Sequence, residues 1–227
     1  MKKVFLSILL CCISIICKAQ TDVTKFLGIP VDGSKAEMMR KIKAKGFTQS
    51  PYAQDVLTGV FNGMDVNVHI GTNKGKVCRI MVCDDNAKSE IDIKNRFNIL
   101  CEQFKTNPRY WSFSEGDQKI QENEDISYEM TAHNKRYEAI FYQIPDITSA
   151  NHQKEIQVLL SSKYSQEQLN NPSEEVAADI NQIAGTYAIE IARKKPVWFC
   201  IQNNSYGQYY IYMFYDNEYN RAHGEDL

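Results

Sequence analysis

The chain has 227 residues, of which 43% are hydrophobic and 24% are charged, with 26 lysines and arginines against 28 aspartates and glutamates. A chain of this length can bury a sizeable core without help from disulfides. Its slightly acidic balance excludes the basic electrostatic footprint typical of nucleic-acid-binding proteins.

The N-terminus has the pattern of a secretory signal peptide. Lys2 and Lys3 precede an apolar run over 4–17, and cleavage is expected after Ala19 or Gln20. The run is about 14 residues long, which is short of the roughly 20 that a membrane-spanning helix needs. We therefore expect export to the periplasm or the extracellular space, with no membrane span after cleavage.

A signal peptide over 1–19 leaves a single α+β domain over 20–227. Cleavage removes three lysines and no acid, so the mature chain has 23 Lys and Arg against 28 Asp and Glu, a formal charge of −5. A lipoprotein signal needs a small residue before the acceptor cysteine, but Ile16 precedes Cys17 and Leu10 precedes Cys11. We therefore expect no lipid anchor.

Cleavage also leaves four cysteines, all among apolar residues: Cys78, Cys83, Cys101 and Cys200. An even count in an oxidising compartment permits disulfides, whereas the apolar surroundings favour buried free thiols. Cys78 and Cys83 are an odd number of residues apart, so on one straight strand they point to opposite faces and cannot bond to each other.

In chain order, the first predicted element is a helix over about 34–45. Ser34 and Glu37 have the spacing of a capping box, Met38 and Ile42 fall on one face, and Gly46 is placed to end the helix. These signals agree with one another, so the helix is expected to bury that face.

The stretch 56–83 predicts three antiparallel strands. Asn62-Gly63 suits a two-residue type I′ turn, which fixes the register of the first two strands. Its apolar face pairs Phe61 with Met64, Gly59 with Val66 and Leu57 with Val68, and its mixed face pairs Val60 with Asp65, Thr58 with Asn67 and Val56 with His69. After a second turn at 73–75, the segment 77–83 has apolar residues on both faces of the expected strand, so it is predicted to be a central strand.

A second helix is predicted after Ser89, ending at Asn107-Pro108. Its buried face has helical spacing: Ile93, Phe97, Leu100, Cys101 and Phe104. The stretch 125–145 predicts another hairpin that turns at Asn134-Lys135. Its expected pairs are Tyr128 with Phe141, Met130 with Ala139 and Ala132 with Tyr137.

The segment 148–171 fits either a short helix or an edge strand. Ser173 then caps a third and longest helix over about 174–194, in which Gly185 is expected to allow another element to approach closely. A last hairpin over 197–217 turns between 203 and 207. A capped helix followed by a hairpin thus recurs three times, which predicts an α+β fold with a mainly antiparallel sheet of about seven strands and three helices on one face.

The last strand carries the candidate binding residues. Tyr210, Tyr212 and Phe214 share one face, and the opposite face holds the alternate residues of the strand. If helices cover one face of the sheet, these three rings form an exposed aromatic surface for an envelope protein, a peptide or a glycan. The alternative is that they pack in a sheet covered on both sides.

The sequence predicts no catalytic residue, no cofactor and no metal site. His69, His133, His152 and His223 lack the spacing of metal ligands and are expected at exposed or strand-lining positions, and no phosphate-binding loop or nucleophile elbow is present. The acidic clusters at 84–86 and 216–218 lack the spacing of a calcium loop. One alternative function is a hydrolase-like envelope enzyme that pairs Cys78 or Cys83 with His69, and another is a structural component of an envelope complex.

Several segments resemble exported proteins of Gram-negative gut commensals: FLGIPVDGSKAEMMRKIKAKGF, FNGMDVNVHIGTNKGKVCRIMV with DIKNRF, ISYEMTAHNKRYEA and YYIYMFYDNEYNRAHGEDL. The similarity spans nearly the whole mature chain, but that group has no established activity, so it implies no role for any residue. The architecture is also similar to small envelope modules of the outer-membrane assembly lipoprotein or β-lactamase-inhibitor type, which place helices against a three-stranded antiparallel sheet. A shared fold does not fix function.

Overall fold

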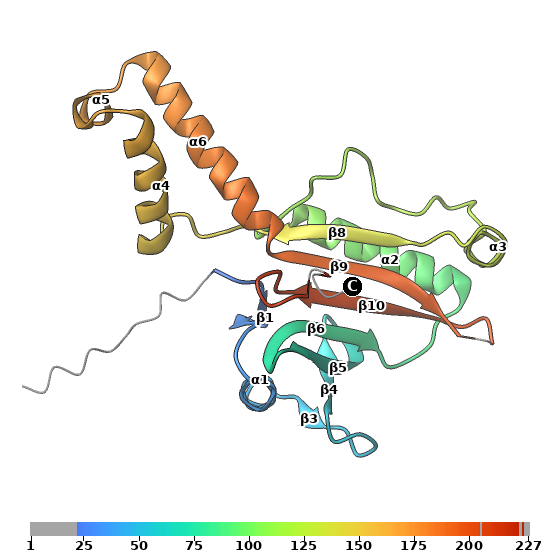
Figure 1. The fold of residues 1–227 in the computed structure, drawn as a ribbon. Coiled ribbons are helices and arrows are strands. Elements are labelled where there is room, and N and C mark those ends of the chain that lie inside the picture. The colour runs from blue at the N-terminus through green and yellow to red at the C-terminus, as the bar shows by residue number, and fades with distance from the viewer. Residues whose placement is uncertain (1–21, 205, 223, 225–227) are drawn as a thin grey trace, which may run out of the picture.

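The computed structural model describes residues 22–204, 206–222 and 224, and the predicted signal peptide over 1–19 lies outside them (Figure 1). The α+β fold class predicted from the sequence is confirmed. The described residues form one antiparallel sheet of eight strands, a second sheet of two strands and six helices. In this part of the chain, no helix is both long enough and apolar enough to cross a membrane.

The large sheet has one strand more than expected. Its strands are β3 (Thr48–Gln49), β4 (Val56–Phe61), β5 (Met64–Asn73), β6 (Lys76–Asp84), β7 (Tyr110–Trp111), β8 (Glu138–Gln143), β9 (Pro196–Asn203) and β10 (Tyr209–Asp216). Their order in space is β3-β4-β5-β6-β10-β9-β8-β7, and each pair of neighbours is antiparallel. β6 therefore lies in the middle of the sheet, as its apolar sequence predicts.

The first hairpin forms in the predicted register. Asn62 and Gly63 have φ values of 50° and 74°, which a type I′ turn requires of its two central residues. Leu57 pairs with Val68 and Phe61 pairs with Met64, as their sequence spacing predicts. The turn residues therefore decide which side chains of this hairpin face the core.

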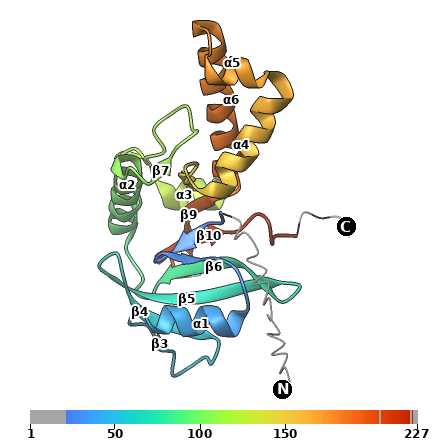
Figure 2. The same cartoon turned by 90° about the vertical axis from the view of Figure 1, so that its left-hand side faces the viewer.

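The sheet consists of two similar halves that meet where β6 pairs with β10. Each half begins with a helix, α1 (Lys35–Lys43) or α2 (Glu90–Thr106), and continues with strands that follow one another in space. In the second half the connection from β8 to β9 holds three inserted helices, α4 (Ala150–Lys163), α5 (Gln166–Asn170) and α6 (Glu174–Arg193). Figures 1 and 2 show that these helices project from the sheet, and together they are called the helical arm below.

The prediction of a hairpin over 125–145 is wrong. The predicted threefold recurrence of a helix followed by a hairpin is therefore wrong as well. The first part of this segment is a helix, α3 (Ile126–Ala132), and β8 pairs with β7 and β9 instead. Asp125 accepts a hydrogen bond from the backbone N–H of Tyr128 at 2.8 Å, which caps α3. The segment 148–171, left open between helix and strand, forms α4 and α5.

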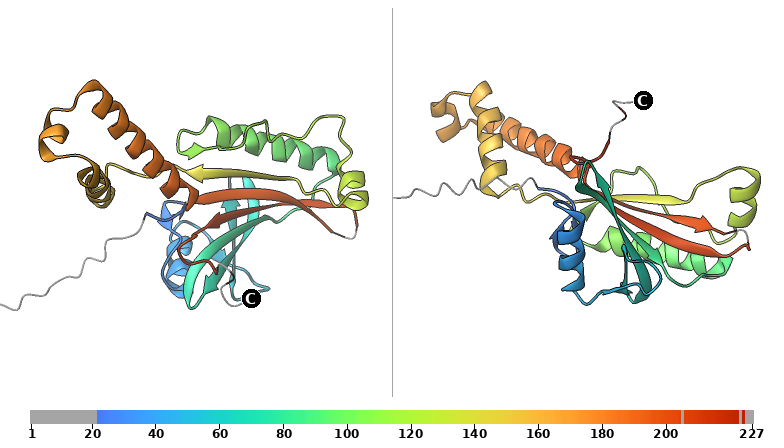
Figure 3. Two further views of the ribbon diagram at one scale, coloured as in Figure 1. Left: turned by 45° about the horizontal axis from the view of Figure 1, so that its top comes forward. Right: turned by 60° about the horizontal axis from the view of Figure 1, so that its bottom comes forward.

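Two helices cover one face of the sheet. Met38 and Ile42 of α1 and the predicted apolar face of α2 are buried in one core with β4, β5, β6, β8, β9 and β10. Figure 3 shows α1, in blue, and α2, in green, as separate helices along the twisted sheet. A small hairpin, β1 (Lys25–Phe26) and β2 (Ile29–Pro30), contributes Phe26, whose ring lies 5.0 Å from that of Tyr215. The third predicted helix, α6, packs against α4 in a separate small core rather than covering the sheet.

Two glycines provide a matched test of packing. A Cβ atom on Gly59 of β4 would lie 2.6 Å from Cδ1 of the buried Phe47 ring, whereas one on Gly185 of α6 would meet nothing within 4 Å. The close approach expected at Gly185 is therefore wrong.

Gly59→Ala is expected to lower the free energy of unfolding by about 1–3 kcal/mol, because the Phe47 ring must move. Gly185→Ala is expected to raise it by about 0.5–1 kcal/mol, because alanine is the better helix former. Urea denaturation of both variants checks the two signs, and a Gly59→Ala variant as stable as the parent would contradict the packing at Phe47.

Candidate functional site

The face of the sheet opposite α1 and α2 carries the residues predicted to bind a partner. Tyr210 and Tyr212 of β10 are half-buried on this face, while Tyr209 and Ile211 are buried on the other. The predicted alternation along the strand is therefore confirmed. Phe214 shares the face with the two tyrosines but is more deeply buried, because a neighbouring ring lies on it.

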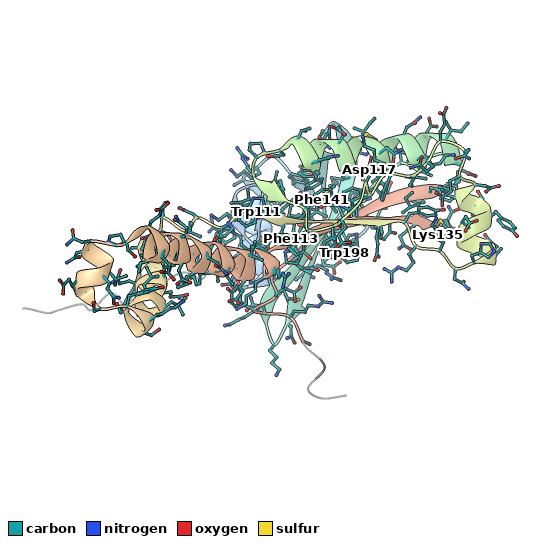
Figure 4. All side chains as sticks on the ribbon, turned by 90° about the horizontal axis from the view of Figure 1, so that it is seen from above. Trp111, Phe113, Asp117, Lys135, Phe141 and Trp198 are labelled. Carbon is teal, nitrogen blue, oxygen red and sulfur yellow. The ribbon has the colours of Figure 1, made fainter. Side chains whose placement is uncertain are left out.

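That neighbouring ring belongs to a larger group of aromatic residues, which we call the aromatic strip: Trp111, Phe113, Tyr142, Trp198, Tyr210, Tyr212 and Phe214. The rings of Trp198 and Phe214 stack at a centroid distance of 4.0 Å, and those of Phe113 and Tyr142 lie 4.8 Å apart. Figure 4 shows Phe113 and Trp198 on one side of β8 and Phe141 on the side of α2. The strip therefore crosses β7, β8, β9 and β10 on the helix-free face.

An ion pair between the half-buried Arg79 and the buried Asp216 holds the centre of the aromatic strip. Arg79 of β6 donates two hydrogen bonds to the Asp216 carboxylate, at 2.5 Å and 2.7 Å, and Trp198 Nε1 donates a third at 2.9 Å. The Arg79 guanidinium also lies 4.8 Å from the centroid of the Phe214 ring. These contacts raise the pKa of Arg79, chiefly through the hydrogen bonds to Asp216. Cation, carboxylate and rings are thus fixed in one arrangement.

A cleft opens at one end of the aromatic strip, beside β8. Its volume is about 570 Å³, and Ile140 and Trp198 line it together with the side chains of Arg136 and Arg221. Arg221 belongs to the segment after β10, which lies in front of the sheet in Figure 1. Glu138 also lines the cleft and pairs with Arg136 at 3.1 Å, so the cleft presents apolar groups and charges of both signs.

The alternative pairing of a cysteine with His69 has no geometry to support it. On β5 and β6, His69 pairs with Met81, whereas Cys83 pairs with Asn67. Burial raises the pKa of the Cys83 thiol to about 12, so the nucleophilic thiolate is scarce at neutral pH. The four cysteines predicted to be buried thiols are free, and of these Cys78 is only half-buried.

A second group of polar residues lies where the helical arm joins the sheet. Lys195 donates to both oxygens of Asp22 at 2.8 Å, and Asp22 Oδ2 lies 3.5 Å from His152 Nε2. The Tyr187 hydroxyl donates to Glu155 at 2.6 Å, so its oxygen accepts from Nδ1 of His152, also at 2.6 Å. We call these five residues the junction network.

Four members of the junction network line a cleft of about 780 Å³: Asp22, His152, Glu155 and Tyr187. Burial lowers the pKa of Lys195, although its bonds to Asp22 act in the opposite direction. His152 is 7% exposed and lies on α4, so its expected placement at an exposed or strand-lining position is wrong. No local pattern could have found this group, because Asp22 and Lys195 are 173 residues apart in the sequence.

Comparison with known proteins gives no relative: no protein family, curated protein or solved structure matches the chain. Within the described residues, no group of three or more His, Cys, Asp or Glu side chains is placed to hold a metal ion. The function therefore has to be argued from the surfaces themselves.

Proposed function

We propose that this chain is an exported, non-catalytic binding module whose partner contacts the aromatic strip. The observation that carries the proposal is the gathering of tryptophan, tyrosine and phenylalanine side chains on a sheet face that α1 and α2 leave uncovered. Tryptophan, tyrosine and arginine are the residues that most often dominate the energy of protein–protein interfaces. An envelope protein or a peptide fits this surface best.

The rigidity of the surface supports the same proposal. The strip rests on paired strands, and its central rings are fixed by the Arg79–Asp216 ion pair and by the stacking of Trp198 on Phe214. Side chains that are already ordered lose little conformational entropy when a partner binds. The free protein therefore presents a surface close to its binding conformation.

A structural role within a larger envelope complex would use the same surface, and it remains the second proposal. An enzymatic role receives less support, because burial keeps Cys83 protonated at neutral pH. A binding module accounts for the strip without requiring any reactive group.

The aromatic strip is tested with the double variant Tyr210→Ala/Tyr212→Ala. The mature chain is cross-linked to partners in an extract of its own envelope, and the captured proteins are quantified by mass spectrometry. Recovery of a specific partner is expected to fall at least about tenfold, because each tyrosine at an interface centre contributes on the order of 1 kcal/mol or more.

The matched control is Tyr52→Ala/Tyr128→Ala, which removes two tyrosines that are 97% and 58% exposed and lie outside the strip. This control is expected to recover the partner as the parent does. Circular dichroism verifies that both double variants are folded. Equal recovery by the strip variant and the control would exclude the strip as the binding surface.

A further inference from the structure

A separate cleft lies on the helix-bearing side of the sheet, where the end of α2 meets β7 and the turn between β4 and β5. Its volume is about 490 Å³. Its lining residues are Phe61, Asn62, Gln103, Phe104, Thr106, Asn107, Tyr110, Met213 and Tyr215. Asn62 Nδ2 donates to Gln103 Oε1 at 2.8 Å, and this bond joins the two halves of the fold at the edge of the cleft. We call it the amide cleft.

Aromatic rings form the apolar part of the amide cleft. The rings of Phe104 and Tyr110 lie 4.7 Å apart, and those of Phe61 and Tyr215 lie 6.4 Å apart. Phe26 packs behind Phe61 and Tyr215 at 5.4 Å and 5.0 Å. The rings are therefore held in place by the core, as in a preformed ligand site.

The polar part of the amide cleft is uncharged: among the described residues that line it, none is acidic or basic. An amide carries two N–H donors and one carbonyl acceptor, so the bond between Asn62 and Gln103 leaves the Asn62 oxygen and the Gln103 amino group available. Asn107 Oδ1 accepts from the Arg109 N–H at 3.1 Å, which leaves its amino group available as well. The rim thus offers both donors and acceptors without a net charge.

We propose that the amide cleft binds a neutral saccharide. The C–H groups on one face of a sugar ring match the aromatic surface that the half-buried Phe61 and Tyr110 leave exposed, and its hydroxyl groups match amides that both donate and accept. A charged ligand would lose hydration there without gaining an opposite charge. This site is distinct from the aromatic strip, because Met213 and Tyr215 point to the opposite side of β10 from Tyr212 and Phe214.

The neighbouring structure indicates a saccharide of more than one ring. A second cleft of about 680 Å³ shares Phe61, Asn107, Tyr110 and Tyr215 with the amide cleft. Its charged lining residues carry both signs, so an anionic ring there would also meet carboxylates, and they offer stronger hydrogen-bonding groups to a following ring: Asp22, Asp146, Lys25, Arg109 and Lys195. An oligosaccharide can therefore place one ring at the amides and continue past Tyr110.

The proposal is tested by nuclear magnetic resonance titration of the mature chain with maltotriose, cellotriose and triacetylchitotriose, with trigalacturonate as the anionic probe. At least one neutral trisaccharide is expected to bind saturably and more tightly than its monosaccharide. Asn62→Gly/Gln103→Ala is expected to weaken that binding at least about fivefold, because hydrogen bonds to the ligand are lost. Glycine at 62 keeps the positive φ of the turn.

The matched control is Gln166→Ala/Asn170→Ala, which removes another exposed pair of amides, bonded at 3.1 Å on α5. The control and the strip variant Tyr210→Ala/Tyr212→Ala are both expected to bind the saccharide as the parent does. Binding by none of the neutral probes, equal binding by the Asn62→Gly/Gln103→Ala variant, or tighter binding of trigalacturonate would each overturn the proposal.

Discussion

Arg79→Met is expected to lower the free energy of unfolding by about 3–5 kcal/mol, because it leaves a buried carboxylate without its cation. Asp216 is 1% exposed and accepts two hydrogen bonds from Arg79, at 2.5 Å and 2.7 Å. Of the side chains that donate to the Asp216 carboxylate, only Trp198 remains in the variant. Because the Arg79 side chain is 33% exposed, water reaches the place that the guanidinium leaves, so the loss is expected toward the lower end of this range. Urea denaturation of the parent and the variant measures the difference.

Two further variants separate the ion pair from a general effect of the substitution. Arg136→Met makes the same change at an arginine whose side chain is 68% exposed and whose partner, Glu138, is 3.1 Å away, so it is expected to cost at most about 1 kcal/mol. Arg79→Met/Asp216→Leu replaces the whole pair by apolar groups and is expected to regain most of the loss. A double variant as unstable as Arg79→Met alone would contradict this account.

The same ion pair connects stability with the proposed function. Arg79 lies over the ring of Phe214 and bonds the carboxylate that also holds Trp198, so its removal frees the central rings of the aromatic strip. A partner would then have to order these rings on binding, at a cost of about 0.5–1.5 kcal/mol for each side chain immobilised. The Arg79→Met/Asp216→Leu variant is therefore expected to be folded and yet to bind its partner more weakly.

Local signals in the sequence were sufficient for the first hairpin, for three of the helices and for the faces of the last strand. Asn62-Gly63 fixes the register of β4 and β5 because a two-residue turn allows one pairing, and the serine caps and apolar stripes locate α1, α2 and α6. The alternation on β10 placed Tyr210, Tyr212 and Phe214 on one face. Each of these predictions depends on residues that are close together in the sequence.

The wrong predictions concern segments where two local patterns compete. Tyr128, Met130 and Ala132 alternate as in a strand, but the Asp125 cap makes their segment a helix of seven residues. Trp111 and Trp198 join the aromatic strip only because β7, β8, β9 and β10 are neighbours in that spatial order, which no short stretch encodes. The junction network and the amide cleft likewise depend on distant residues that the complete fold brings together.

Asp22→Ala is expected to destabilise the fold by about 3–5 kcal/mol near neutral pH, because Lys195 is left as an unpaired buried cation. Lys195 is 3% exposed, and Asp22 supplies both acceptors for its ammonium group at 2.8 Å. Asp22 also contacts His152 of α4 and accepts from the backbone N–H of Asp146 at 3.3 Å. Its loss therefore weakens the attachment of the helical arm as well as the core beneath it.

The sign of the pH dependence provides the sharpest test of this account. Burial already lowers the pKa of Lys195, and removal of Asp22 takes away the group that opposes this effect. A lysine whose pKa is lower in the folded than in the unfolded state binds fewer protons when folded. The free energy of unfolding therefore rises as the pH increases from the pKa of the folded state to that of the unfolded state. The difference in free energy of unfolding between the parent and Asp22→Ala is therefore expected to narrow as the pH is raised toward about 10, the ordinary pKa range of a lysine. Asp22→Ala/Lys195→Met is expected to be more stable than Asp22→Ala at neutral pH and to show no such gain in stability as the pH rises. An equal gain in both variants would show that Lys195 is not the source of the pH dependence.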